Sequence, residues 1–505
     1  MAVHRAIRVA AVLAASFAAG FVVHADKPSS HAADIQLQLA QLFFDDGRYY
    51  DSLEAFQKAL EGSDPTRARV ARAGVVQSAL RVAEFAIARR EAEELLKMDP
   101  HSPDAMTLYG DSVWASGLFD EAESSYRDAL AMVHDLARGH HGLARALLAR
   151  SQLDQALGEA QAALRLSPRD LEIHHTVGAI YERMHNYEAA AAAFTNYVNL
   201  LPNKDRSDKA AWSRAEIRFL KSFGQKVPFE IEPGANDMLY TVPFKLMNDK
   251  VVVRAKVNDA AAQDFVLDTG SENTVVSRQT ASRLGIDPIT YTLSAGVGRI
   301  GLRGLQLARI DSFEIGTLKL RNVPCLIKNP PLKDIPVKES ESFSPLALGF
   351  SMTIDYKKKE LTIGRHIPPE DKDFELPLRV YRLATVRGVV DRNHQANFVI
   401  DTGGEVISIS QATATALGRP DTARKIALKV YGTSGWDPDA FLMPGVDLAF
   451  DAIHYRNFPV VVLNLDAPSA LLGFQLGGIV GHKFLSSYRV GIDLDRSVLR
   501  LKKVL

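Results

Sequence analysis

The chain has 505 residues, of which 47% are hydrophobic and 24% charged, and its 60 basic and 60 acidic side chains leave no formal net charge. This composition is that of a globular protein, and the length predicts about three domains rather than one core. The balanced charge gives no reason to expect nucleic acid or an anionic membrane as a partner. The single cysteine, Cys325, excludes an intramolecular disulfide, and its strand-like surroundings predict a small buried apolar residue.

Residues 1–25 have the pattern of an export signal. Arg5 and Arg8 form a positive start, and an apolar run over residues 9–23 leads to a small residue at Ala25. A membrane-spanning helix needs roughly 20 apolar residues, more than this run supplies. The pattern predicts a cleaved signal peptide, with retention as an anchor as the alternative. We therefore expect a periplasmic or secreted protein with no membrane span after cleavage.

Residues 31–204 contain a helical pattern that recurs five times, at a spacing of about 34 residues. An aromatic or apolar position recurs in each unit: Tyr49, Phe85, Phe119, Leu153 and Tyr187. Three positions later each unit has a small residue: Ser52, Ala88, Ala122, Ala156 and Ala190. Small residues let two helices cross closely, and a proline ends three of the units because it cannot continue a helix.

This period and these positions resemble tetratricopeptide repeats, in which helix pairs stack because one pair cannot bury its own apolar face. The resemblance implies a concave groove that binds a peptide or a protein partner. Residues 205–226, which include Trp212, are expected to form a final capping helix. The histidine pairs at 140–141 and 174–175 lack an acid or a cysteine to complete a ligand set, so no metal site is expected.

Beyond the repeats the alternation of apolar and polar residues indicates strands, and one unit is present twice, over residues 235–366 and 374–505. Phe-Val-Leu-Asp-Thr-Gly at 265–270 returns as Phe-Val-Ile-Asp-Thr-Gly at 398–403. A Leu-Gly pair follows each aspartate at the same offset in both units. A glycine-rich segment comes next, and then an apolar-apolar-Gly triplet whose distances from the two aspartates differ by a single position.

The order of these elements resembles that of retropepsins, the family of retroviral-type and bacterial aspartic proteases. The resemblance implies two all-β lobes in which Asp268 faces Asp401 within one chain. It also implies that Thr269 and Thr402 cross-link the two aspartate loops through their hydroxyls, and that the apolar-apolar-Gly triplets thread behind these loops.

The chemistry explains why two copies are needed. Hydrolysis of an amide by one water needs a base to take a proton and an acid to protonate the carbonyl oxygen. Two carboxyl groups about 3 Å apart cannot both ionise, so they share a proton and supply both roles. Ser271 could donate a hydrogen bond to Asp268, whereas its counterpart Gly404 has no side chain. We therefore expect Asp268 to be the ionised partner and Asp401 the protonated one.

Further roles follow from position in the two units. Gly270 and Gly403 permit a tight turn and a close backbone approach that a side chain would obstruct. Glu272 and Glu405 lie four residues after each aspartate, where the family has a contact with the substrate backbone, and a surface ion pair is the alternative.

Two glycine-rich segments are candidate flaps that would close over a substrate and exclude water. Their glycines are Gly296 and Gly298 in the first unit and Gly432 and Gly435 in the second. The alternative is a pair of plain hairpin turns, which glycines mark in any protein.

Together these patterns predict a multidomain protein, with an all-α helical-repeat solenoid followed by an all-β pair of retropepsin-like lobes. We expect an aspartic endopeptidase that acts on a protein or peptide substrate without a cofactor, with the repeats recruiting substrate or a partner. Two alternatives stay open: a non-catalytic adaptor whose lobes grip peptide, and an active site paired between two chains. The adaptor is favoured by the first unit, because its segment from Gly349 to Asp355 is half as long as the second unit's segment from Gly481 to Asp493 and so lacks a short helix.

Overall fold

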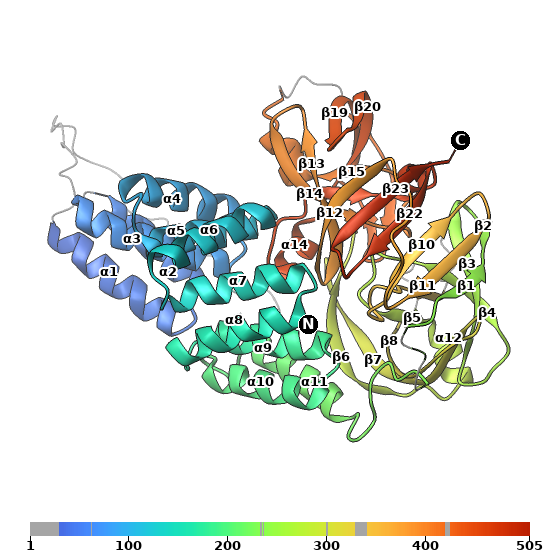
Figure 1. Ribbon diagram of the computed structural model, residues 1–505. Coiled ribbons are helices and arrows are strands. Elements are labelled where there is room, and N and C mark those ends of the chain that lie inside the picture. The colour runs from blue at the N-terminus through green and yellow to red at the C-terminus, as the bar shows by residue number, and fades with distance from the viewer. Residues whose placement is uncertain are drawn as a thin grey trace, which may run out of the picture.

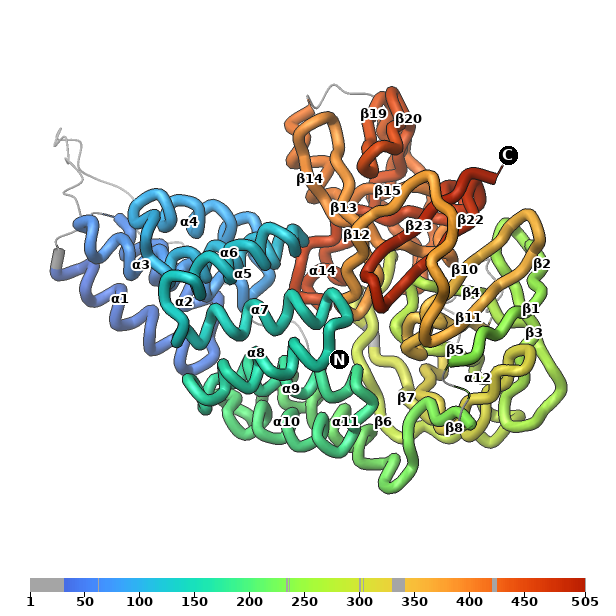
Figure 2. Tube along the Cα trace, in the orientation of Figure 1, coloured from blue at the N-terminus to red at the C-terminus, as the bar shows by residue number. Residues whose placement is uncertain are grey.

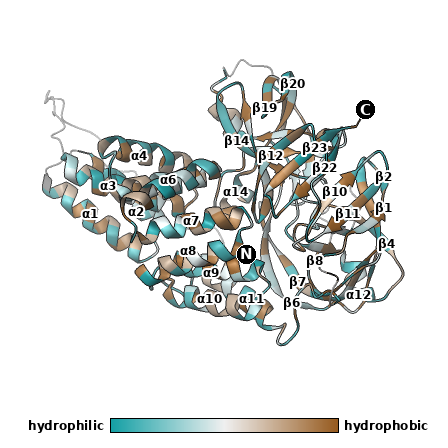
Figure 3. Cartoon of the chain, in the orientation of Figure 1, coloured by the Kyte–Doolittle hydropathy of each residue, from teal (hydrophilic) through white to brown (hydrophobic). Residues whose placement is uncertain are grey.

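The computed structural model describes residues 30–504 apart from 62, 233–234, 236, 299–300, 329–340 and 420–424. The predicted signal peptide lies outside the described residues. The chain forms a helical half followed by a β half, and the two lie side by side (Figure 1). Within the described ranges no helix is both long and apolar enough to cross a membrane. The helices in Figure 3 accordingly carry hydrophilic and hydrophobic residues side by side.

The helical half is a stack of helix pairs, which confirms the predicted solenoid. In chain order the helices are α1 (Ser30–Asp45), α2 (Tyr49–Leu60), α3 (Pro65–Arg81), α4 (Phe85–Met98), α5 (Pro103–Ala115), α6 (Phe119–Met132), α7 (Ala137–Ala149), α8 (Leu153–Leu166), α9 (Leu171–Arg183), α10 (Tyr187–Leu200) and α11 (Asp208–Lys221). The second helix of each pair begins at the recurring aromatic or apolar position. The small residue three positions later is fully buried in all five pairs, because the two helices cross there.

The stack curls until its two ends meet. Asn203 follows α10 and donates a hydrogen bond from Nδ2 to the backbone oxygen of Asp46, which follows α1 (2.7 Å). Arg81, at the end of α3, forms an ion pair with Glu172 at the start of α9. These contacts between distant repeats make the helical half one body rather than a flexible chain of pairs.

The first β lobe is a sheet with strand order β2-β3-β4-β9-β5-β8-β7-β6. Its elements are β2 (Lys245–Met247), β3 (Lys250–Val257), β4 (Gln263–Leu267), β5 (Thr274–Val276), α12 (Arg278–Arg283), β6 (Pro288–Ala295), β7 (Leu302–Ile315), β8 (Leu318–Ile327) and β9 (Glu341–Phe343). Cys325 lies fully buried in β8, and burial raises the pKa of its thiol, which is the unreactive state predicted for it.

The second lobe belongs to a larger sheet with order β1-β11-β10-β22-β23-β12-β13-β14-β21-β15-β20-β19-β16. Its strands are β1 (Tyr240–Pro243), β10 (Ser351–Asp355), β11 (Glu360–Gly364), β12 (Phe374–Tyr381), β13 (Leu383–Val390), β14 (His394–Ile400), β15 (Ser408–Ser410), β16 (Ile426–Ala427), β19 (Phe441–Phe450), β20 (Ile453–Leu463), β21 (Gly478–Val480), β22 (Tyr488–Asp493) and β23 (Val498–Lys503). Three short helices complete this lobe: α13 (Gln411–Ala416), α14 (Asp466–Leu472) and α15 (His482–Leu485).

The two lobes are joined by main-chain pairing. Strand β10, the last but one strand of the first unit, pairs antiparallel with β22 of the second, with Thr353 opposite Gly491. A single sheet therefore runs from β1, β11 and β10 into β22, β23 and β12. The buried carboxylate of Asp493 at its centre accepts from Arg496 and Arg500, each at 2.9 Å. This shared sheet fixes the pairing of the two lobes within one chain.

The repeat half packs against both lobes. Figure 2 shows α11 (green) beside β6 of the first lobe, and α7 beside β12 of the second. Aromatic rings of the repeats meet those of the second lobe: Trp114 lies 5.2 Å from Tyr381, and Phe119 lies 5.0 Å from Phe474, between ring centroids. Contacts of this kind are a packed core, so the repeats are not a tethered appendage.

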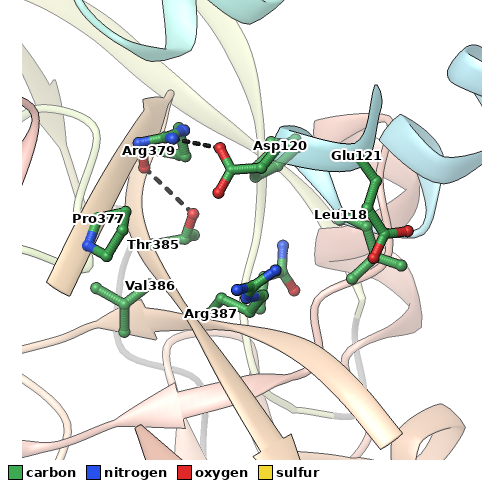
Figure 4. Close-up of a pocket in the computed structure, with 11 residues that line it drawn as sticks. Leu118, Asp120, Glu121, Pro377, Arg379, Thr385, Val386 and Arg387 are labelled. Carbon is green, nitrogen blue, oxygen red and sulfur yellow. Dashed lines mark hydrogen bonds and ion pairs between the residues drawn. The ribbon is translucent and has the colours of Figure 1, made fainter. Parts of the chain in front are cut away.

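A small cavity lies between the repeats and the second lobe (Figure 4). On one side the carboxylate of Asp120 forms an ion pair with Arg379, whose backbone oxygen accepts from Thr385 Oγ1 (3.2 Å). The cavity holds about 20 Å³, enough for roughly one water. Asn397 lines it, and its Nδ2 has no protein partner among the described residues, which such a water would supply.

We predict that Gly142→Ala destabilises the repeat half. A Cβ at Gly142, within α7, would overlap the buried ring of Tyr126. Overpacking of this kind costs about 1–3 kcal/mol. Thermal or urea unfolding followed by circular dichroism measures the effect. Gly158→Ala in α8 is the matched control: no atom lies within 4 Å of its Cβ, and alanine is the better helix former by about 1 kcal/mol. Equal stability of the two variants would contradict the prediction.

Candidate active site

Each aspartate follows directly on a buried strand. Strands β4 and β14 are fully buried at their last residues, and Asp268 and Asp401 come next. The backbone N–H of Asp268 donates to the oxygen of Phe343 (2.9 Å), and that of Asp401 to the oxygen of Val480 (3.0 Å). Each acid is therefore held by a strand that lies beside its own.

The two carboxyl groups face each other across the junction of the lobes and are hydrogen-bonded together. Each also packs against the glycine of the opposite loop. A Cβ at Gly270 would lie 2.5 Å from Cγ of Asp401, and a Cβ at Gly403 would lie 2.7 Å from Oδ1 of Asp268. Both distances are too short for a side chain, so glycine is required at these positions.

The threonines of the two loops cross-link them. The backbone N–H of Thr269 donates to Thr402 Oγ1 (3.1 Å), and that of Thr402 donates to Thr269 Oγ1 (3.0 Å). Each hydroxyl then donates across the junction, Thr269 to the oxygen of Ile400 (2.6 Å) and Thr402 to that of Leu267 (2.7 Å). All four bonds are buried, so the separation of the two loops is tightly fixed.

The two carboxyl groups differ in charge. Oδ1 of Asp401 accepts the backbone N–H groups of Gly403 (2.8 Å) and Gly404 (2.9 Å). These donors favour its ionised form against the burial that raises its pKa. Among the described residues no backbone N–H donates to the carboxyl group of Asp268, and burial and the charge of Asp401 raise its pKa to about 7. At mildly acidic pH the pair therefore shares one proton, which Asp268 carries.

The predicted division of charge was wrong. Ser271 does not donate to the carboxylate of Asp268; its Oγ donates to the backbone oxygen of Asn273 (2.9 Å), within its own turn. Gly404, which has no side chain, instead donates its backbone N–H to Oδ1 of Asp401. Asp401 accepts two backbone N–H groups, whereas Asp268 receives no bond from Ser271, so Asp401 is the ionised partner.

The strand threaded behind the first aspartate was also misassigned. In the second lobe β21, from the triplet that ends at Gly481, pairs parallel with β14 as expected. In the first lobe β9 takes that place by pairing parallel with β4. The residues aligned to the triplet, 347–349, lie beyond β9 in a turn that ends at Gly349 with φ of +74°. An apolar-apolar-Gly pattern suits a strand and a turn equally, and sequence alone did not separate them.

This correction removes the apparent trimming of the first lobe. The segment from Phe343, at the end of β9, to Asp355 is only a single position shorter than the segment from Val480, at the end of β21, to Asp493. The turn over residues 345–349 occupies the place that α15 occupies in the second lobe. The two lobes therefore have nearly equal frames behind their aspartates.

The two glutamates expected near the substrate are both engaged in ion pairs. Oε2 of Glu272 accepts from Nε of Arg382, in the β12–β13 turn, at 2.6 Å. Glu405 is exposed, and its Oε1 accepts from Lys483 at 2.7 Å. These contacts match the alternative interpretation, a local ion pair, for both residues.

The candidate flaps meet at their tips. The first is the β6–β7 hairpin, and the second is the hairpin of β17 (Val430–Gly432) and β18 (Gly435–Asp437). The backbone N–H of Ser434 donates to the oxygen of Val297 (3.0 Å) between the tips. The predicted flap glycines lie at this contact: Gly296, Gly298, Gly432 and Gly435. A Cβ at Gly296, Gly298 or Gly432 would collide with the opposite hairpin.

A charged cluster from the repeats lies beside the first aspartate loop, and no spacing in the sequence indicated it. Glu182 of α9 and Glu216 of α11 lie close to each other and to the Glu272–Arg382 pair. Burial and the neighbouring carboxylates raise the pKa of Glu182 to about 8, and burial raises that of Glu216 to about 7, while Arg382 opposes both shifts. The repeats thus contribute side chains to the surroundings of the site.

Comparisons with known proteins agree with this architecture. Residues 253–351 and 384–481 each match the family model described as aspartyl protease, and residues 76–137 match that of the tetratricopeptide repeat. A search among curated protein sequences gives no match. The chain therefore joins tetratricopeptide repeats to two retropepsin-like aspartyl protease units.

Solved structures similar to the chain include tetratricopeptide repeat proteins. A thermophilic TPR protein from Thermus thermophilus is 20% identical, with 36% of this chain and 99% of that one covered and a TM-score of 0.31. MamA from Desulfovibrio magneticus is 19% identical, with coverages of 34% and 94% and a TM-score of 0.25. At such scores the likeness supports no statement about function.

We predict that Thr402→Val destabilises the junction of the lobes, whereas Thr402→Ser is tolerated. Valine leaves the N–H of Thr269 and the oxygen of Leu267 without their partner in a buried place. Each such group costs about 1–3 kcal/mol, and serine keeps both bonds. Urea unfolding of the two variants measures the difference. A valine variant as stable as the serine variant would contradict the role given to the cross-link.

The raised pKa of Asp268 predicts a pH dependence of stability. Between the ordinary value of 3.8 and about 7 the folded chain keeps a proton that the unfolded chain loses. This contribution is therefore present at low pH and is lost as pH rises, by at most about 1.4 kcal/mol per pH unit. In Asp268→Asn the decline between pH 4 and 7 should be shallower, whereas exposed Asp264→Asn should keep the full slope. Parallel unfolding curves for both variants would contradict the shift.

Proposed function

We propose that the chain is an aspartic-type endopeptidase whose active site is formed in cis by Asp268 and Asp401. The observation that carries this proposal is the pair of half-buried carboxyl groups that hydrogen-bond to each other, held by four reciprocal threonine bonds. A merely structural pair of like acids would be costly, because burial and the charge of Asp401 both disfavour ionisation of Asp268. The pair is useful where one acid and one base must act on the same substrate.

The division of charge gives each residue a step. Asp401, ionised, takes a proton from a water as that water attacks the carbonyl carbon, and Asp268 gives its proton to the carbonyl oxygen. A neutral tetrahedral diol forms, and both carboxyl groups have exchanged protonation states. As the C–N bond breaks, Asp401 gives its proton to the leaving nitrogen and Asp268 takes one back from a diol hydroxyl. The site returns to its first state without a cofactor.

We further propose that the repeats bring protein substrate or a partner to this site, and that the chain acts after export in the periplasm or outside the cell. The location rests on the signal-like pattern of residues 1–25. The repeats support protein binding by their family, and their packing against both lobes would place a bound segment near the cleft. The non-catalytic adaptor was favoured by a short segment behind Asp268, but the segment from Phe343 to Asp355 is nearly as long as its counterpart in the second lobe.

Cleavage of an unfolded protein substrate across pH 3.5–7.5 tests the proposal. We expect Asp268→Asn and Asp401→Asn each to lower kcat/KM by roughly 10³-fold or more, because either change removes the acid or the base. Activity should decline above about pH 7, where Asp268 loses its proton. Initial rates from a fluorogenic assay, with mass spectrometry of the products, measure both effects.

The matched control is Asp264→Asn, an exposed aspartate four residues before Asp268 that should keep wild-type activity. Cleavage that survives either active-site change would rule out the paired mechanism. A folded wild-type chain that cuts nothing yet binds the same substrate would favour the adaptor function.

A further inference from the structure

The first-lobe flap, defined here as β6 with the tip 296–298 and β7 as far as Leu307, is covered on one face by the last helix of the repeats. Leu305 and Leu307 are 9% and 4% exposed, and they pack in one apolar cluster with Phe219 and Phe223 of the α11 region. Burial of these two leucines makes opening of the flap unfavourable, because opening would expose their side chains to water. The contact therefore couples the flap to the repeat half.

Polar contacts at the base of the flap add to this cluster. Nη1 of Arg309, two residues beyond Leu307 in β7, donates to the backbone oxygen of Ser222 (3.2 Å). The guanidinium of Arg309 also lies 5.3 Å from the centroid of the Phe223 ring. Trp212 of α11 approaches the middle of the hairpin, where a Cβ at Gly304 would lie 3.8 Å from its ring.

At its other end the flap is bound to the second flap. The N–H of Ser434 donates to the oxygen of Val297 (3.0 Å), and Ser434 Oγ donates to the oxygen of Gly301 (3.2 Å). These two bonds are exchangeable for bonds to water and so are cheap to break. The apolar contact with α11 costs more to break, because its loss exposes Leu305 and Leu307 to solvent.

We propose that α11 is a clamp that holds the first-lobe flap closed, so that the chain rests as a latent protease and opens when α11 moves off β7. This inference rests on the proposed function and adds its regulation. The repeats then act as more than a docking site: a partner that shifts α11 changes access to Asp268 and Asp401. The charged cluster of Glu182, Glu216 and Arg382 includes a side chain of α11, so this helix also bears on the first aspartate loop.

Two mild variants loosen the clamp without touching the site. Trp212→Ala removes the ring beside Gly304, and Arg309→Ala removes the bond to Ser222 and the stacking on Phe223. Asp120→Asn is the matched control, because it weakens a repeat–lobe ion pair of the second lobe, away from the flap (Figure 4).

Hydrogen exchange of the backbone amides in 290–298 and 302–307, read by mass spectrometry, tests the clamp independently of catalysis. We expect both loosened variants to exchange roughly tenfold faster there and Asp120→Asn to exchange as wild type does. In parallel, kcat/KM on an unfolded protein substrate should rise roughly three- to tenfold in the loosened variants, although their melting temperature falls slightly. Ordinary packing defects lower activity, so a gain is specific to a clamp.

Unchanged exchange in the flap, or activity that falls together with the melting temperature, would overturn the proposal. Faster exchange in the flap with no cleavage by any variant would keep the clamp and reject the protease function. Adding Asp268→Asn to a loosened variant should abolish the gain in cleavage while leaving the faster exchange in place.

Discussion

Two carboxyl groups that cannot both ionise lie together at the junction of the lobes, and the rest of the β half keeps them there. Their repulsion is relieved only by a shared proton, which requires the two groups to be held close together. The threonine bonds set that separation locally. The sheet that passes from β10 into β22 sets it globally, because the lobes cannot part without breaking a strand pairing. The threonine bonds and the shared sheet thus both fix the separation of the two carboxyl groups.

The helical half also helps to hold the two lobes in place. The pairing of the two aspartates is weakened by any motion of one lobe against the other, and the repeats contact both lobes. Trp114 and Phe119 make edge-on contacts with rings of the second lobe. Phe219 and Phe223 join the apolar cluster that contains Leu305 of the first lobe. The repeats therefore brace the two lobes from one side, so a movement within the repeats would change how the lobes sit against each other.

The repeats and the duplication could be predicted from the sequence because each is periodic. A helix pair or a strand-loop unit that recurs at a constant offset indicates its own boundaries, and the second helices begin where the pattern placed them, from Tyr49 to Tyr187. The threaded strand of the first lobe could not be predicted. Strand β9 reads Glu-Ser-Phe, so no apolar run marks it in the sequence, and only its pairing with β4 identifies it as the threaded strand.

The charge of the two aspartates was beyond the sequence for a different reason. A serine beside an acid is visible as a donor, whereas a backbone N–H is present at every residue and becomes a donor only through the path of the loop. Gly404 allows that path: a Cβ there would lie 2.8 Å from Oδ2 of Asp401. Ser271, at the matching position, carries a Cβ, and its N–H faces the backbone oxygen of Asp268 instead. One missing side chain thus turns a duplicated motif into two chemically different acids, which a reaction that needs both an acid and a base requires.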